Sequence, residues 1–119
     1  MKGLYICKTY LYSSDLSKII PVLKYGRTNN IETRMLHYNK IAPYKLLVFF
    51  PCKDFIDLRE NLIQREYDEY RLNKSEHIIY KSGLFKQLYR QVKDAASCKI
   101  TKSKNKNGAI IHTIEDATL

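Results

Sequence analysis

Four side chains suited to binding a phosphate group occur within a stretch of 15 residues. Lys24 and Arg27 flank Gly26, and Arg34 and Tyr38 follow in the next part of the chain. Lysine and arginine pair with phosphate oxygens, and a phenol can hydrogen-bond to phosphate or water. A strand that runs through Gly26 into a helix would bring all four side chains close together. This stretch therefore predicts a phosphate-handling site.

The residues around this set predict a short strand followed by a helix. Gly26 allows backbone angles that are closed to other residues, and Asn29 with Glu32 three positions on has the pattern of a helix N-cap and its reciprocal acid. We expect the helix to begin near Asn30, with Arg34 at the border of an apolar stripe that faces the sheet. The stripe consists of Ile31, Met35 and Tyr38. The alternative is an ordinary amphipathic helix whose arginine merely lies along its apolar edge.

Three aromatic and apolar runs predict strands. The first covers residues 3–12. We expect a short helical turn or wide loop over 16–20, which Pro21 ends, and a second strand over 22–25. The run over 44–50 is short and rich in strand-forming residues, so it predicts a buried third strand.

A long helix is expected after the third strand. Asp54 has the chemistry of an N-cap for a helix over 55–72, which carries a broad apolar arc for packing on a sheet. Glu60 falls at the edge of this arc, and Glu66 falls nearer its middle. A carboxylate beside a buried face needs a cation, a hydrogen-bond donor or a metal. The alternative to a metal site is a structural ion pair of this carboxylate with Arg59 or with a lysine from the sheet.

The C-terminal part of the chain predicts a last helix and then a basic arm. Apolar residues recur at helical spacing over 84–96. We expect residues 1–98 to form one domain and residues 99–119 to form a basic flexible arm and tail. Within the arm, 109–114 is expected to add a short strand or to dock on the body.

Composition narrows the class of partner. The chain of 119 residues is long enough for one domain with its own core, and its net charge is +9, with acidic residues in excess only over 54–76. A basic body favours a polyanionic partner, since each lysine or arginine that neutralises a phosphate releases a counterion. On charge alone, RNA and a membrane surface are alternatives to DNA. Because no apolar run approaches ~20 residues and no signal-peptide pattern opens the chain, we expect a soluble intracellular protein without a membrane partner. We expect its three cysteines to be small buried hydrophobic residues.

In combination and order, these pieces resemble the GIY-YIG nuclease superfamily. Residues 3–5, Gly-Leu-Tyr, look like its G-I-Y, and residues 24–28, Lys-Tyr-Gly-Arg-Thr, look like its Y-I-G-(K/R)-T strand end in the K-I-G-R-T form of phage and viral branches. Arg34 matches the helix arginine, and Glu60 matches the glutamate of the later helix. The resemblance covers roughly residues 3–93.

The resemblance implies an α/β (α+β) fold, a small three-stranded antiparallel sheet flanked by helices. It also implies an endonuclease that hydrolyses DNA phosphodiester bonds with one divalent cation, Mg²⁺ or Mn²⁺, of the kind used in repair, recombination or replication. In this interpretation Glu60, or alternatively Glu66, holds the metal, and Arg34 stabilises charge that builds on the phosphoryl oxygens. Tyr5 accepts a proton from the attacking water, and Tyr38 orients water or phosphate.

Two further expectations concern protonation and DNA contacts. A free tyrosine titrates near ~10, so Tyr5 acts as a base at neutral pH only if Lys24, Arg34 and the metal lower its pKa. His37 is an alternative proton carrier. The DNA contacts expected outside the catalytic set are made by Arg27, Lys8, Lys40, Lys102 and Lys104.

Two departures from the family pattern keep other functions open. Lys24 stands where the first tyrosine of Y-I-G is expected, and Arg59 stands where an apolar residue is expected, which leaves Glu66 as a competing metal ligand. The second hypothesis is therefore a catalytically silent DNA-binding module of the same fold. The third is a protein-interaction domain whose charge serves solubility.

Overall fold

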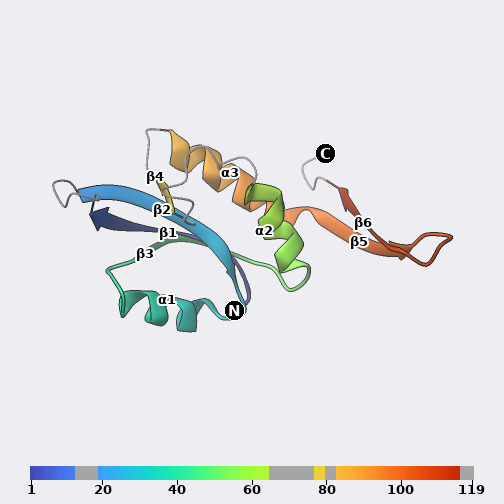
Figure 1. The fold of residues 1–119 in the computed structure, drawn as a ribbon, viewed down its shortest axis with the longest axis horizontal. Coiled ribbons are helices and arrows are strands. Elements are labelled where there is room, and N and C mark those ends of the chain that lie inside the picture. Colours follow the sequence, from blue (N-terminus) through green and yellow to red (C-terminus); the bar gives the residue numbers. More distant parts are fainter. Residues whose placement is uncertain (13–18, 65–76, 80–82, 116–119) are drawn as a thin grey trace.

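Three long antiparallel strands form the framework of this computed structural model, which describes residues 1–12, 19–64, 77–79 and 83–115 (Figure 1). A short fourth strand extends the sheet, giving the order β3-β1-β2-β4, and a separate pair, β5-β6, forms a two-stranded hairpin. The elements are β1 (Gly3–Tyr12), β2 (Ile19–Thr28), α1 (Ile31–Asn39), β3 (Lys45–Pro51), α2 (Ile56–Gln64), β4 (His77–Ile79), α3 (Leu84–Ser97), β5 (Lys99–Lys104) and β6 (Ile110–Glu115). The predicted α+β class and its three-stranded antiparallel core are confirmed, and β4 is an addition to them.

Helices cover both faces of the sheet. Because side chains alternate along a strand, β1 directs Tyr5 and Cys7 to the face covered by α1 and directs Leu4 and Ile6 to the face covered by α2 and α3 (Figure 1). The larger core lies on the second face, where the buried residues of α3 are Leu84, Leu88, Val92 and Ala95. The smaller core lies under α1 and contains Tyr5, Cys7, Ile31 and Tyr38.

The second strand is longer than its sequence predicts. It begins at Ile19 and runs through Pro21, so a helical turn over residues 19 and 20 is wrong, while residues 16–18 lie outside the described part. Pro21 lacks a backbone N–H, and in the described part of the chain β4 pairs with Val22–Lys24 and leaves Pro21 beside β1 alone. The pairing between β1 and β2 covers ten residues of each strand. Pro21 therefore lies within a strand and does not end a helical turn.

Helix α1 follows the prediction, with its cap one residue later. Asn30 is the N-cap, and its side-chain oxygen accepts a hydrogen bond of 3.2 Å from the backbone N–H of Thr33. The expected cap at Asn29 is wrong because β2 continues to Thr28, whose hydroxyl accepts a hydrogen bond from the N–H of Asn30. Ile31 and Tyr38 are buried on the sheet side, as the apolar stripe predicts.

The third strand and the second helix differ from the sequence expectation in detail. β3 is an edge strand of half-buried and exposed residues, not a fully buried one, because β1 is its one partner among the described strands. Helix α2 is described from Ile56 to Gln64, and the rest of the helix expected up to residue 72 lies outside the described part. The side chain of Asp54, expected as its N-cap, instead accepts a hydrogen bond of 3.0 Å from Arg59. Phe55, which precedes the helix, has a positive φ of 53°.

Arg59 is a buried cation that joins α2 to the end of α3. Its side chain is 6% exposed, and its Nη1 donates to the backbone oxygens of Ala95, at 3.0 Å, and Cys98, at 2.6 Å. Its Nε donates to the backbone oxygen of Asp54. A helix ends with unpaired carbonyl groups and a partial negative charge, and a buried arginine satisfies both. This explains why an arginine occupies a position where an apolar residue was expected.

We expect Arg59→Met to destabilise the fold by about 3 kcal/mol, because the carbonyls of Ala95 and Cys98 would lose their buried donor. Urea unfolding followed by circular dichroism measures this change. The control is Asp54→Asn, whose side chain is 64% exposed and whose loss of charge should cost less than about 1 kcal/mol. Equal losses for the two variants would contradict this role of Arg59.

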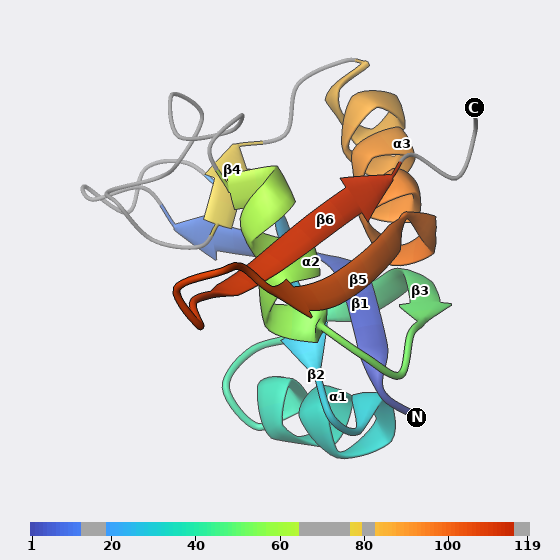
Figure 2. The same cartoon turned by 90° about the vertical axis from the view of Figure 1, so that its right-hand side faces the viewer.

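The C-terminal segment forms a hairpin. Residues 99–108 were expected to form a flexible arm, but Lys99–Lys104 pairs with Ile110–Glu115 over six positions. The irregular arm expected over 99–108 is therefore wrong, and the strand expected within 109–114 is confirmed. The hairpin extends beyond the body in Figure 1 and crosses in front of α2 in Figure 2.

The cysteines meet a simpler expectation. Cys7, Cys52 and Cys98 are buried free thiols. Burial raises the pKa of Cys7 to about 12, with nearby Lys24 acting in the opposite direction, so Cys7 remains a thiol at neutral pH. In the part of the chain that the structure describes, none of the helices combines the length and the apolar character needed to cross a membrane.

Candidate functional site

A hollow of about 350 Å³ opens where β2 has a free edge. In the described part of the chain β4 pairs only with Val22–Lys24, so the end of β2 carries no strand on that side. Side chains from both faces of the sheet can therefore meet around this edge. The lining includes all five residues predicted as catalytic, Tyr5, Lys24, Arg34, Tyr38 and Glu60, together with Gly26, Arg27, His37 and Ile41.

Gly26 lets the side chain of Tyr5 reach the hollow. The two residues are paired across β1 and β2, and a Cβ atom on Gly26 would lie 2.7 Å from the Tyr5 hydroxyl oxygen and 3.0 Å from Cζ. Gly26 does not have the positive φ that the sequence suggested, since among the described residues the positive-φ glycines are Gly83 and Gly108. Glycine is needed at position 26 for close approach by a phenol.

We expect Gly26→Ala to destabilise the protein by about 1–3 kcal/mol, because the buried Tyr5 ring must move away from the new methyl group. Urea unfolding of the single variants and of the double variant Gly26→Ala/Tyr5→Phe forms a double-mutant cycle. Removal of the hydroxyl relieves the closest contact, so the double variant should be more stable than the sum of the single changes predicts. Strict additivity would contradict the close-approach explanation.

Two tyrosines form the floor of the hollow. The hydroxyls of Tyr5 and Tyr38 are hydrogen-bonded to each other, and their rings meet edge to face with centroids 6.1 Å apart. Tyr44 stacks on the other side of Tyr38 at 4.8 Å. Burial is the main cause that raises the pKa of Tyr5 above its ordinary value, the hydrogen bond with Tyr38 adds to it, and Arg34 acts against it. Tyr5 is therefore a neutral phenol at neutral pH in this structure.

Two cations lie over the ring of Tyr38. The Lys24 Nζ is 4.7 Å from the ring centroid, and the Arg34 guanidinium carbon is 5.8 Å from it. Lys24 comes from β2 and Arg34 from the half-buried border of α1, as the sequence predicts. One aromatic ring thus positions two positive charges at the same hollow, which is the arrangement that an incoming phosphate requires.

The acidic side of the hollow comes from α2. The Glu60 side chain is 12% exposed, and one of its oxygens lies 4.0 Å from Nη1 of Arg27. Arg27 also pairs through Nε with Asp57 at 2.9 Å, where the carboxylate is 71% exposed. Glu60 is not paired with Arg59, whose partners are Asp54 and the end of α3, so this structural alternative is wrong. Among the described residues, the cation from the sheet that approaches Glu60 is an arginine, Arg27.

The other residues predicted to contact DNA or a metal either lie outside the hollow or fall outside the described part of the chain. Lys8 lies 5.3 Å from the ring centroid of Tyr10, Lys40 follows the last residue of α1, and Lys102 and Lys104 lie on the hairpin. None of these four lysines lines the hollow. Glu66, the alternative metal ligand, falls among the residues that the structure does not describe.

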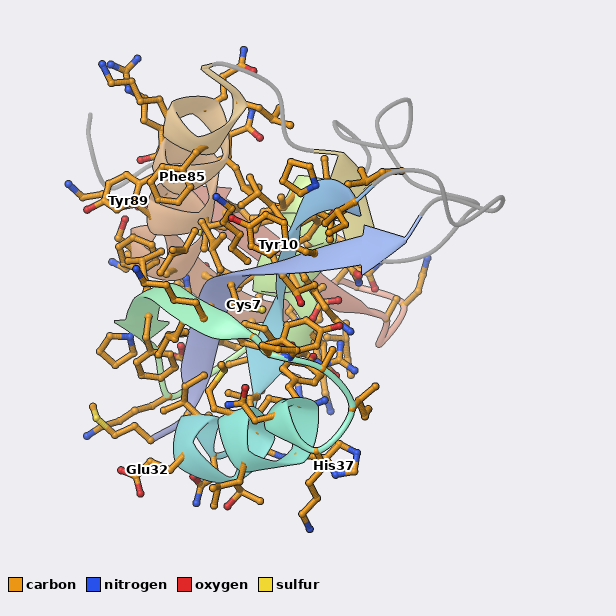
Figure 3. All side chains as sticks on the ribbon, turned by 90° about the vertical axis from the view of Figure 1, so that its left-hand side faces the viewer. Cys7, Tyr10, Glu32, His37, Phe85 and Tyr89 are labelled. Atoms are coloured by element: carbon orange, nitrogen blue, oxygen red, sulfur yellow. The ribbon has the colours of Figure 1, made fainter. Side chains whose placement is uncertain are left out.

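His37 lies at the edge of the site. It is exposed near the C-terminal end of α1, away from Glu32 at the other end of the helix (Figure 3). It lines the hollow and also a neighbouring hollow of about 320 Å³. His37 is therefore accessible to solvent and remains a candidate proton carrier.

Sequence reasoning missed two residues that shape the site. Asp57 orients Arg27 by an ion pair, and Tyr44 stacks on Tyr38. The Arg27–Asp57 pair joins elements that are distant in the chain, and the Tyr38–Tyr44 stack depends on the course of the loop between α1 and β3. The only available signal was the chemistry of the residues themselves, an acid in the first turn of a helix and an aromatic residue at a strand start.

The family model of the T5orf172 domain matches residues 2–100, most of the chain. The chain belongs to the T5orf172 domain family. This is a phage-associated domain related to nucleases, and the match contains every residue of the hollow. Searches of curated proteins and of solved structures found no match for the chain. A T5orf172 domain points to a role among nucleases and DNA-binding proteins, and the hollow is its candidate site.

Proposed function

We propose that this T5orf172 domain is a divalent-metal-dependent DNA endonuclease with the chemistry of the GIY-YIG superfamily. The observation that carries the proposal is the convergence of Tyr5, Lys24, Arg34, Tyr38 and Glu60 on one hollow, although they come from four separate elements. A fold does not require these five polar side chains to meet at a free sheet edge. A site that hydrolyses a phosphodiester does require cations, a carboxylate and a proton acceptor together.

The cations are assigned to the scissile phosphate. Arg34 and Lys24 lie over the same ring and are both half-buried, so a phosphate in the hollow meets two positive charges that are already oriented. Charge that builds on the phosphoryl oxygens in the transition state is stabilised by such preorganised donors. Arg27, held by Asp57 and Glu60, is assigned to a flanking phosphate.

The carboxylate of Glu60 is suited to the role of metal ligand. Its carboxylate is mostly buried yet lines the hollow, and Mg²⁺ at phosphoryl-transfer sites is commonly held by one or two carboxylates, with waters and substrate phosphates completing the shell. Within the described ranges no group of three or more acids, histidines and cysteines gathers to hold a metal by itself, and a single carboxylate is what this mode needs. A bound Mg²⁺ or Mn²⁺ would supply charge stabilisation at the phosphate and leaving oxygen.

Tyr5 is assigned as the proton acceptor for the attacking water, with Tyr38 as its orienting partner. Both hydroxyls are within hydrogen-bond contact, so a proton on Tyr5 has a defined neighbour. The raised pKa of Tyr5 means that few molecules carry the phenolate at neutral pH, and its population grows as pH rises. The activity should therefore depend steeply on pH.

A catalytically silent DNA-binding module is the second candidate, and the neutral, buried Tyr5–Tyr38 pair is the observation that favours it. The test is incubation of the purified protein with supercoiled, branched and single-stranded DNA in Mn²⁺ or Mg²⁺, with EDTA as the control. Nicking that requires the metal supports the endonuclease. Salt-sensitive binding without any cleavage between pH 7 and 9, roughly the window in which a base must act, supports the silent module.

A further inference from the structure

The C-terminal hairpin, residues Lys99–Glu115, has no role in the proposed chemistry. It projects from the body in Figure 1, and nearly all of its residues are exposed. Exposed side chains include the large apolar residues Ile110, Ile111 and Ile114. Such a ribbon adds little to the core, so its sequence is available for contacts with a partner.

The base of the hairpin is fixed to the helix that carries Glu60. Ile100 is buried at 7% exposure, and Arg59 of α2 donates to the backbone oxygen of Cys98, directly before β5. At the start of α2 the ring of Phe55 meets the ring of His112 edge to face at 5.6 Å. These contacts fix the base of the hairpin beside the start of α2, and in Figure 2 the hairpin crosses in front of this helix.

The hairpin has an inner face toward α2 and an outer face. Residues directly opposite each other in an antiparallel pair point to the same side, and Lys102 is opposite His112, which contacts Phe55 just before α2. The inner face therefore comprises Ile100, Lys102, Lys104, Ile110, His112 and Ile114. The outer face comprises Lys99, Thr101, Ser103, Ile111, Thr113 and Glu115.

The tip of the hairpin is held in one shape by its own side chains. The side-chain oxygen of Asn105 accepts hydrogen bonds of 2.9 Å from the backbone N–H groups of Asn107 and Ala109. Gly108 takes a positive φ of 79°, which glycine adopts without strain. A preorganised tip loses little conformational entropy when it enters a binding site.

We propose that the tip of this hairpin and the exposed outer end of its inner face, at Lys102, Lys104 and Ile110, enter the major groove of duplex DNA, an inference that rests on the proposed function. The hairpin carries four lysines, Lys99, Lys102, Lys104 and Lys106, against one acid, Glu115. The major groove, about 12 Å wide, admits a two-stranded β-ribbon, and strands of this length span about 20 Å, or roughly six base pairs. Lysines reach phosphates and guanine edges, and isoleucines meet thymine methyl groups.

Charge favours DNA over a second copy of the chain as the occupant. Two hairpins brought together would place lysines against lysines, since Lys102 and Lys104 share the inner face with the exposed Ile110 and Ile114. A polyanion turns the same charges into favourable contacts while the isoleucines lie over bases. The hairpin is then a base-reading element attached to the helix of the candidate site.

The test compares Lys102→Gln/Lys104→Gln with Lys99→Gln, which removes a charge from the outer face beside Glu115. Affinity for a duplex of about 20 base pairs is measured in EDTA by fluorescence anisotropy over a range of salt. We expect the inner-face double variant to lose at least about tenfold in affinity and to lower the salt slope by about two. Lys99→Gln should change the affinity by less than about threefold. Dimethyl sulfate should methylate guanine N7, a major-groove atom, less in the wild-type complex than in free DNA.

Three results would overturn the proposal. These are wild-type binding by the double variant, guanine N7 that stays unprotected, and dimers in sedimentation that Ile110→Lys abolishes, which would make the hairpin a self-association surface. Circular dichroism confirms that each variant is folded. Because these assays contain no metal, they are independent of cleavage. Failure of the endonuclease proposal appears instead as intact DNA with unimpaired binding.

Discussion

Glu60→Gln is expected to reduce DNA cleavage by about a thousandfold, or about 4 kcal/mol of transition-state stabilisation. The substitution keeps the size and hydrogen-bonding shape of the side chain and removes only its charge. An amide is a poor ligand for a hard divalent cation, and Glu60 is the acidic residue that lines the hollow in the described part of the chain. Single-turnover nicking of supercoiled DNA in saturating Mn²⁺ measures the effect.

Asp57→Asn is the matched control for this prediction. Asp57 lies on the same helix and, like Glu60, contacts Arg27, but its side chain is 71% exposed and does not line the hollow. Its loss should lower cleavage by less than about tenfold, because it acts only through the orientation of Arg27. DNA affinity in EDTA should be unchanged or slightly tighter for Glu60→Gln, since a negative charge is removed. Cleavage by Glu60→Gln at the wild-type rate would exclude Glu60 as metal ligand and return attention to Glu66.

The residues that line the hollow were predicted better from the sequence than the bounds of the helices and strands were. A charged side chain beside a buried face carries a cost in free energy unless it has a partner. Arg34 at the edge of an apolar stripe and Glu60 at the edge of an apolar arc are such side chains, and both line the hollow as predicted. Helical spacing fixes which side a residue faces, and so local pattern was sufficient for α1. The reason for Gly26 was not local, because it depends on a tyrosine in the neighbouring strand.

What the sequence could not predict depends on pairing between distant residues. The run from Lys99 to Lys104 looks like a solvated basic arm, and it becomes a strand because Ile110–Glu115 pairs with it. The start of β2 at Ile19 and the satisfaction of the α3 end by Arg59 are likewise tertiary effects. A single buried arginine in an otherwise apolar arc gave no indication of which carbonyls it would reach.

Tyr5→Phe is the second large expected effect. If Tyr5 accepts the proton of the attacking water, its loss should lower the cleavage rate about a thousandfold, within the range for a positioned general base. The hydroxyl is removed without a change in ring packing, although the hydrogen bond to Tyr38 is lost. The single-turnover rate at about pH 8, the middle of the window of about pH 7 to 9 in which the base must act, measures it against the wild type.

The pH profile separates a base from a hydrogen-bond donor. Burial holds the pKa of Tyr5 above its ordinary value, so the reactive phenolate is scarce below that pKa and its population rises tenfold for each pH unit. The wild-type rate should therefore climb about tenfold per unit between about pH 7 and 9, and Tyr5→Phe should remove this dependence. A rate that falls as pH rises would show that the protonated phenol is the active form.

Tyr38→Phe makes this prediction sharper. The hydrogen bond with Tyr38 is the second largest cause of the raised pKa of Tyr5, so its removal should lower that pKa and shift the rising limb of the profile toward lower pH. A merely structural role for Tyr38 would lower the rate at every pH without moving the limb. A shift in the opposite direction would show that Tyr38 donates its hydrogen bond to the Tyr5 phenolate and stabilises it, with Tyr5 still the base.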